Sequence, residues 1–244
     1  SLAAATAGAA HSASFPILSA LVLLPIIGAV LVVLTSNRRP EYVKLIATLF
    51  SVGVAGMSIW LLASFKTSDG GFQFQSKHEW ISSWGISWHL GVDGISLFLV
   101  VLTGILFPLV IVGIDPHHDH KRYLAWLLVL EAGVMGSFLS LDLFLFFIFF
   151  EIVLVPMYFL IGGWGYDKRV YAATKFFLYT MFGSALMLVA FLALFFKTGA
   201  ESFAIPYLIE NGGAIAKNVQ IWIFAGLFIG FAVKVPMFPF HTWL

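Results

Sequence analysis

Glu151 is an acidic residue inside a long run of apolar residues. The run reads FLFFIFFEIVLVPMYFLIG, and apolar side chains flank Glu151 for a helical turn on either side. A charge at the centre of a membrane helix costs roughly 2.5–3.5 kcal/mol on insertion scales. A buried carboxylate poised between its charged and neutral forms can relay protons. The alternative is a neutral Glu151 that makes one hydrogen bond between helices.

Lys234 is a basic residue in a comparable setting. It follows Gly226 and Gly230 at intervals of four residues, so the three share one face of a helix. Small residues there allow another helix to approach closely, which directs the ammonium into a bundle. The alternative is snorkelling of the side chain to the membrane surface. Pro236 and Pro239 follow, and we expect them to break the helix, as at transporter ion sites.

Three further residues are candidates for the same proton relay. Glu131 lies in the apolar stretch LAWLLVLEAGVMGSFLS, where it is either a second relay acid or a structural hydrogen-bonding group. His241 follows Lys234 by seven residues, and Lys175 is expected just inside the membrane, within reach of Glu151. The predicted relay therefore comprises Glu151, Lys234, Glu131, His241 and Lys175.

No cofactor site is predicted in this chain. His117, His118 and His120 could chelate a metal, but such a cluster in the short polar loop DPHHDHK is more often solvated. The sequence has no GxxxxGK[ST], GxGxxG, GxSxG or HExxH pattern, which argues against a nucleotide, flavin, haem or catalytic metal. It has no cysteine, which excludes disulfides and thiolate ligation of iron–sulfur clusters.

The composition is that of a membrane protein. Hydrophobic residues make up 61% of the chain and charged residues 10%, with a mean hydropathy of +0.99. Soluble domains carry about 25% charged residues. The net charge of +1 predicts no nucleic-acid partner. Since the sequence begins without Met and stops just after a charged intramembrane site, we expect it to be part of a longer protein.

Seven stretches are long enough to span a bilayer, which needs about 20 apolar residues per helix. They are residues 15–34, 44–65, 94–113, 123–141, 143–165, 173–196 and 220–242. One set of loops holds eight cations, namely Arg38, Arg39, Lys44, Lys121, Arg122, Lys168, Arg169 and Lys175. The other set holds Lys66, Lys77, Lys197 and Lys217. The positive-inside rule places the first set in the cytoplasm and the amino terminus outside.

The sequence thus predicts an all-α polytopic membrane protein with one small β element. Alternating residues near 72–92 predict an outer-face hairpin, expected to be an interfacial lid without a catalytic role, and Asp93 should cap the next helix. We expect a tail over 1–14, three helices with the hairpin over 15–113, and four helices over 114–244.

The charged stretches also resemble a known family. LDLFLFFIFFEIVLVPMYFLIGGWG, AATKFFLYT and FAVKVPMFPFHTWL are similar to the antiporter-like, proton-translocating subunits of NADH-quinone oxidoreductase, respiratory complex I. The resemblance implies the amino-terminal half of a fold of about fourteen helices with two inverted repeats, the first incomplete here. It makes Glu151 the essential glutamate of the fifth helix, Lys234 the lysine of a broken seventh helix, and Glu131 an acid of the fourth.

The resemblance implies a function in the bacterial inner membrane. Quinone reduction in partner subunits, which hold NAD, FMN, iron–sulfur clusters and quinone, would drive protons past the buried charges of this chain. The partners would be other membrane subunits, especially neighbouring antiporter-like ones, and the lipid bilayer. Two alternatives stay open: a subunit of a multi-subunit Na⁺/H⁺ antiporter or membrane-bound hydrogenase, and a structural membrane scaffold.

Overall fold

The computed structural model describes residues 16–36 and 40–244. The predicted tail over 1–14 and the cations Arg38 and Arg39 lie outside these residues. The described residues form two compact units. The first contains those up to His78 together with Trp88–Ser140, and the second contains Glu79–Ser87 together with Leu141–Leu244.

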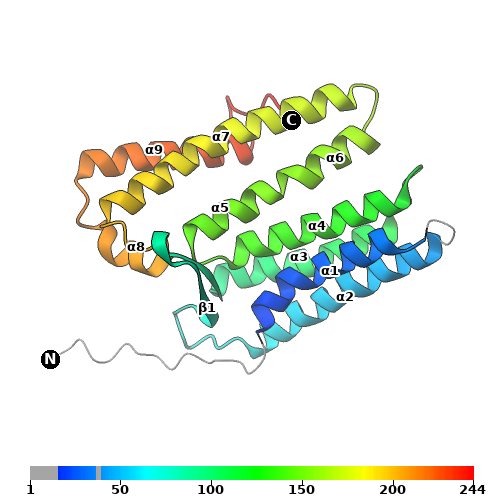
Figure 1. Cartoon of the computed structure of the whole chain (residues 1–244), viewed down its shortest axis with the longest axis horizontal. Helices are drawn as coiled ribbons and strands as arrows, with labels where there is room; N and C mark the ends of the chain where they lie inside the picture. The colour runs from blue at the N-terminus through cyan, green and yellow to red at the C-terminus, as the bar shows by residue number, and fades with distance from the viewer. Residues whose placement is uncertain (1–15, 37–39) are drawn as a thin grey trace. The chain divides into compact units, whose positions relative to one another are not determined.

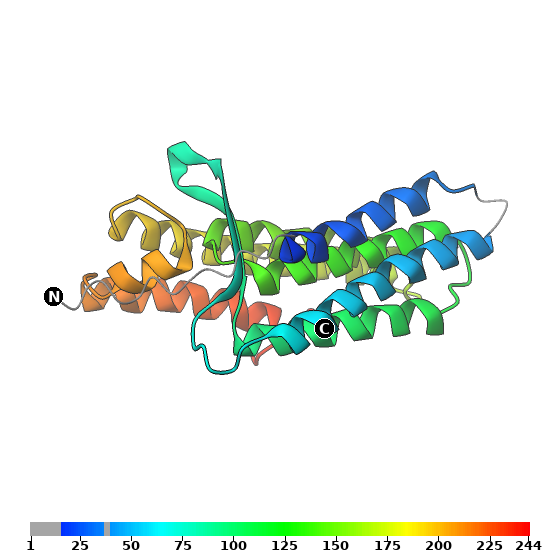
Figure 2. The same ribbon diagram turned by 90° about the horizontal axis from the view of Figure 1, so that it is seen from below.

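The first unit is a bundle of four helices that run side by side (Figures 1 and 2). They are α1 (Ile17–Leu34), α2 (Pro40–Ser64), α3 (Gly94–Gly113) and α4 (His120–Leu139). Helix α1 packs against α2 and α4, and α2 packs against α3 and α4. Gly28 allows α1 and α2 to approach closely, because a Cβ at this position would lie only 2.7 Å from the Cβ of Phe50 in α2.

The second unit is also helical. It contains α5 (Leu143–Ile152), α6 (Leu154–Trp164), α7 (Arg169–Lys197), α8 (Ile205–Gly212) and α9 (Lys217–Lys234). Helix α7 packs against α5, α6 and α9. Figure 1 shows α5 and α6 following one another along nearly one line, beside the longer α7.

A break at Val153 divides the fifth predicted span into α5 and α6. Pro156 accounts for it, because proline has no N–H to donate to the carbonyl four residues earlier, and its ring clashes with that carbonyl. The carbonyl in question belongs to Ile152, the last residue of α5. The helix is thus interrupted two residues after Glu151.

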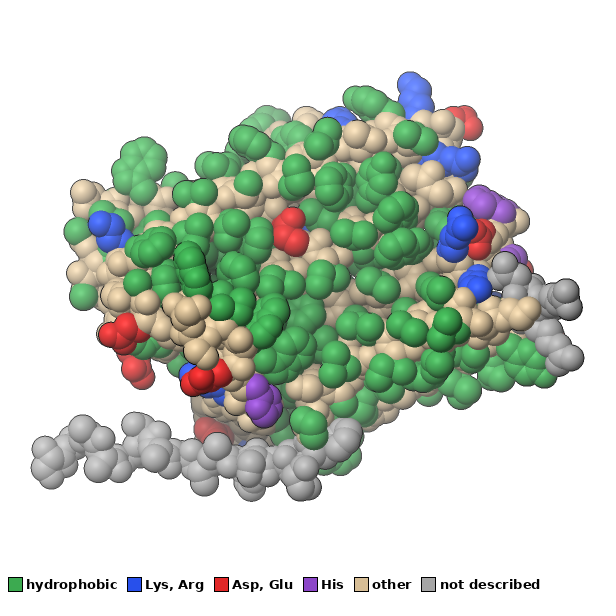
Figure 3. All heavy atoms as spheres, viewed as in Figure 1, with side chains coloured by type: hydrophobic (Ala, Val, Ile, Leu, Met, Phe, Trp, Pro, Cys, Tyr) green, Lys and Arg blue, Asp and Glu red, His purple; other side chains and the backbone are tan. Residues whose placement is uncertain are grey.

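The chain is a multi-pass membrane protein. Among the described residues, six helices are long and apolar enough to span a bilayer: α1, α2, α3, α4, the α5–α6 pair and α7. The face seen in Figure 3 is covered largely by hydrophobic side chains, as a lipid-contacting surface requires. Helix α9 is not one of the six, since its 18 residues include Lys217, Asn218, Gln220 and Lys234.

The expected end of the helix before Pro236 and Pro239 is present. Helix α9 stops at Lys234, and residues 235–243 form mainly turns. Within the described residues, turns and no second half-helix follow α9. Trp243 nevertheless returns to α9, because its indole N–H donates to the Val233 carbonyl at 2.8 Å.

The predicted hairpin is also present. Strands β1 (Gln73–Ile81) and β2 (Ile86–Val92) pair in a two-stranded sheet (Figure 2), with the short helix η1 (Ser82–Trp84) between them. Gly85 follows η1 with φ +60°, and a Cβ there would lie 2.0 Å from the Glu201 carbonyl oxygen, so only glycine fits. Asp93 caps α3 in a capping box with Ser96, as predicted.

His89 of β2 is a buried, neutral histidine that ties the two strands together. Its ring nitrogen Nε2 lies 3.2 Å from the Gln75 side-chain oxygen of β1. Burial, assisted by the charge of Lys77, lowers the pKa of His89 to about 4. The unfolded chain, with a histidine pKa near 6.5, binds more protons between these values. Stability is therefore lost as the pH falls from about 6.5 toward about 4.

We expect this histidine to destabilise the fold by about 2 kcal/mol between pH 7 and pH 5. Replacement with glutamine keeps a donor for Gln75 but removes the titration. Thermal unfolding of the purified wild-type and His89→Gln proteins at both pH values measures the difference. The explanation is wrong if the two proteins lose the same stability on acidification.

Candidate functional site

Glu151 lies one residue before the end of α5, in the second unit. Its Oε1 atom is buried and has no hydrogen-bond partner among the described residues. The Ser184 hydroxyl of α7 is near this carboxylate, and it donates to the Met181 carbonyl at 3.0 Å. Since a hydroxyl has one proton to donate, this bond leaves none for Glu151.

Lys234 is the last residue of α9. Its Nζ atom is buried and, within 16–36 and 40–244, has no hydrogen-bond partner. Lys234 and Glu151 are close enough to interact electrostatically, but no direct ion pair joins them among the described residues. The ammonium lies over the ring of Phe150, 4.5 Å from its centroid. The end of a helix also suits a cation, because the backbone dipoles place partial negative charge there.

Close packing of α9 on α7 places Lys234 inside the bundle. A Cβ on Gly230 would lie 2.7 Å from Met187, and one on Gly183 would lie 2.8 Å from Val233. The predicted glycine face of α9 is therefore confirmed as a helix contact, and Gly226 meets Ala190 in the same way. The ammonium points into this unit rather than snorkelling to a surface.

Glu131 lies in α4 of the first unit and is fully buried. The Ser51 hydroxyl of α2 donates to its Oε1 atom at 3.0 Å. Its Oε2 atom has no hydrogen-bond partner in the part of the chain that the structure describes. The carboxyl group is therefore held at one oxygen and free at the other.

Lys175 and His241 each have another neighbour. Lys175 of α7 donates to the Thr242 carbonyl beyond α9. His241 is exposed, and its ring lies 5.6 Å from that of Phe238. Among the described residues, no direct ion pair joins either of them to Glu151.

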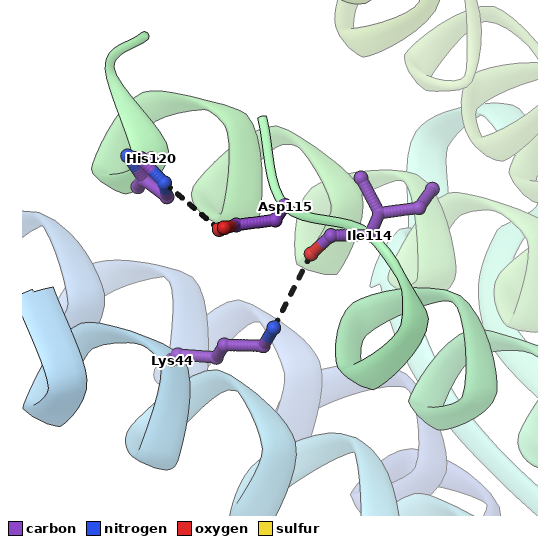
Figure 4. Close-up of polar contacts among 4 residues, drawn as sticks. All are labelled: Lys44, Ile114, Asp115 and His120. Atoms are coloured by element: carbon purple, nitrogen blue, oxygen red, sulfur yellow. Dashed lines mark hydrogen bonds and ion pairs between the residues drawn. The ribbon is translucent and has the colours of Figure 1, made fainter. Parts of the chain in front are cut away.

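The histidine-rich loop before α4 holds ordinary surface contacts (Figure 4). His120 pairs with Asp115 at 3.0 Å, and Lys44 reaches from α2 to the Ile114 carbonyl at 3.3 Å. The described residues contain no group of three or more potential metal ligands.

Asp142 is a buried carboxylate whose role the sequence analysis missed. One oxygen accepts from the backbone N–H of Phe144 and Leu145 at the start of α5, at 3.0 and 3.1 Å. The other accepts from the backbone N–H and the hydroxyl of Ser87 in β2, at 3.0 and 3.3 Å. Burial raises the pKa of the Asp142 carboxyl above its usual value, and these hydrogen bonds oppose that rise. An acid just before an apolar run was a helix-capping signal.

The chain is similar to known membrane proteins. Residues 140–244 match the family described as "NADH:quinone oxidoreductase/Mrp antiporter, TM". Over 94% of its length the chain is 40% identical to "NADH-quinone oxidoreductase subunit M" of Rickettsia typhi. The chain resembles this antiporter-like family. A second relative, "NADH-ubiquinone oxidoreductase chain 4" of Arabidopsis thaliana, is 39% identical over 93% of the chain.

Solved structures share the fold. A chain of respiratory complex I from Thermus thermophilus with bound NADH matches 93% of this chain with a TM-score of 0.81 and 26% identity. A chain of the Mrp complex from Dietzia matches with a TM-score of 0.79 at 16% identity, which shows the fold alone. This chain spans about half the length of its curated relatives, 48% for Rickettsia typhi and 46% for Arabidopsis thaliana.

Proposed function

We propose that this chain is part of a proton-translocating membrane subunit of an NADH:quinone oxidoreductase. One observation carries the proposal: the Glu151 carboxylate, with one oxygen buried, and the buried Lys234 ammonium lie in one helical unit, and among the described residues no direct ion pair joins them. A structural ion pair would be closed and hydrogen-bonded, because a buried charge left open is costly. An open pair of opposite charges suits a switch.

The energies of such a switch match its task. Opposite charges about 4 Å apart attract by about 4 kcal/mol at an effective dielectric constant of 20. Moving one charge against 100 mV costs about 2.3 kcal/mol. Closing the Glu151–Lys234 pair would hold the lysine charged, and opening it would release a proton toward the next group. Glu131, Lys175 and His241 are proposed as further members of the path.

The energy would come from quinone reduction in partner subunits, which would hold NAD, FMN, iron–sulfur clusters and quinone. We propose no redox centre in this chain. We propose that the chain crosses the membrane seven times, with α9 as the seventh span. These spans would form the amino-terminal half of a two-repeat fold. In this arrangement the amino terminus lies outside the bacterial inner membrane, and Lys44, Lys121 and Arg122 lie in the cytoplasm. A reporter enzyme fused to the loop before α4 tests the orientation.

A second candidate function is a subunit of a multi-subunit Na⁺/H⁺ antiporter, which is favoured by the match of residues 140–244 to a family whose description also names the Mrp antiporter. Isolation of the assembly through a tag on the full-length protein separates the two. We expect flavin and iron–sulfur subunits among the partners. We also expect the assembly in proteoliposomes to take up protons when quinone is reduced. Partners without redox centres, or Na⁺ movement without quinone reduction, would contradict the complex I proposal.

A further inference from the structure

The buried ammonium of Lys234 has an unusual environment. Its Nζ atom has no hydrogen-bond partner among the described residues, and no direct ion pair joins it to Glu151. A charge removed from water is costly unless something compensates it. The Phe150 ring, with its centroid 4.5 Å from Nζ, supplies such a contact through the negative potential of its face.

Neighbouring aromatic rings fix the Phe150 ring in this orientation. Phe231, which precedes Lys234 on α9, meets Phe150 edge to face at a centroid distance of 6.2 Å and an angle of 83°. Phe146, one turn earlier on α5, lies 5.4 Å from Phe150 and 6.3 Å from Phe231. Edge-to-face pairs are a preferred geometry of aromatic rings. The ring is therefore presented face-on to the ammonium by its packing.

We propose that Phe150 is a positioning residue that holds the Lys234 ammonium in the open state of the pair. Phe150 and Glu151 are consecutive residues of α5, so their side chains lie about 100° apart around the helix. Both are close to the same cation, and α5 ends one residue after Glu151. A turn of this last helical segment would exchange the ring for the carboxylate in front of Lys234.

The inference rests on the proposed function, since it assigns Phe150 a part in the same proton switch. Fluorination of the ring tests it, because fluorine withdraws charge from the ring face and hardly changes ring size. Mono-, di- and trifluorophenylalanine are placed at position 150 by nonsense suppression, in the full-length protein within its assembled complex. We expect the rate of proton translocation to fall stepwise, to about one tenth with the trifluoro ring.

Phe144 is the matched control, because it belongs to the same helix α5 but its ring pairs with Phe203, at a centroid distance of 5.8 Å, and does not lie over Lys234. The fluorinated series at position 144 should leave translocation unchanged, and Phe150→Trp should retain it where Phe150→Leu does not. Equal translocation across the Phe150 series would overturn the inference. Lys234→Ala in the same assay separates the two proposals: loss of translocation there, with a flat Phe150 series, refutes the role of Phe150 alone. Unchanged translocation in Lys234→Ala would refute both.

Discussion

Replacing Glu151 with glutamine is expected to lower proton translocation by about 100-fold or more, the range of a lost acid–base group. Glutamine keeps the shape of the side chain and an acceptor oxygen, but it cannot ionise. The switch would lose its negative charge, so Lys234 would have no carboxylate to pair with. Quinone-driven proton uptake by inverted membrane vesicles, normalised to the amount of assembled complex on a native gel, is the measurement.

Glu210→Gln is the matched control for this substitution. Glu210 is an exposed acid of α8 in the same unit, and its replacement should leave translocation unchanged. If Glu151→Gln pumps protons like the wild type in a fully assembled complex, the buried charges only lock helices together. The chain would then be a structural scaffold, the third reading of its sequence.

Replacing Asp142 with alanine is expected to lower the free energy of unfolding by about 2–4 kcal/mol. The substitution removes the acceptor of four hydrogen bonds, and it leaves the backbone N–H groups of Ser87, Phe144 and Leu145 buried without that partner. Unfolding of the purified full-length protein, followed by helical circular dichroism in lipid nanodiscs, measures the loss.

Asp93→Ala provides the comparison. Asp93 also caps a helix, accepting from the backbone N–H of Ile95 and Ser96. It is only partly buried, so its loss should cost about 1 kcal/mol, as for an ordinary cap. Equal losses for the two variants would show that the bonds from Ser87 add nothing. Asp142→Asn, which keeps one acceptor oxygen, should fall between wild type and Asp142→Ala.

The sequence predicted those features that depend on local patterns. Long apolar runs predicted the helices, alternation predicted β2, and the residue before an apolar run predicted the Asp93 cap. The glycines at intervals of four residues correctly placed one face of α9 against another helix. In each case a short stretch of chain sets the backbone or the contact face, so one sequence is enough.

Other features depend on residues far apart in the chain. The position of Asp142 before an apolar run signals at most a helix cap, but two of the four hydrogen bonds that it accepts come from Ser87, 55 residues earlier. Phe150 was one of 26 phenylalanines, and only tertiary packing places its ring beneath Lys234. The hydrogen bond from Lys175 to the Thr242 carbonyl likewise joins residues 67 positions apart. Short sequence patterns do not specify such contacts, because the contacts join residues far apart in the chain.

The Asp142 junction has a mechanical consequence. The Asp142 side chain accepts hydrogen bonds both from Ser87 in β2 and from the first amides of α5. A displacement of the strand is therefore transmitted to the helix. Glu151 lies nine residues onward, about 13 Å along a stiff rod. A neighbouring protein that displaces the hairpin tip would therefore tilt α5 and change the position of the Glu151 carboxylate without contributing any charge of its own.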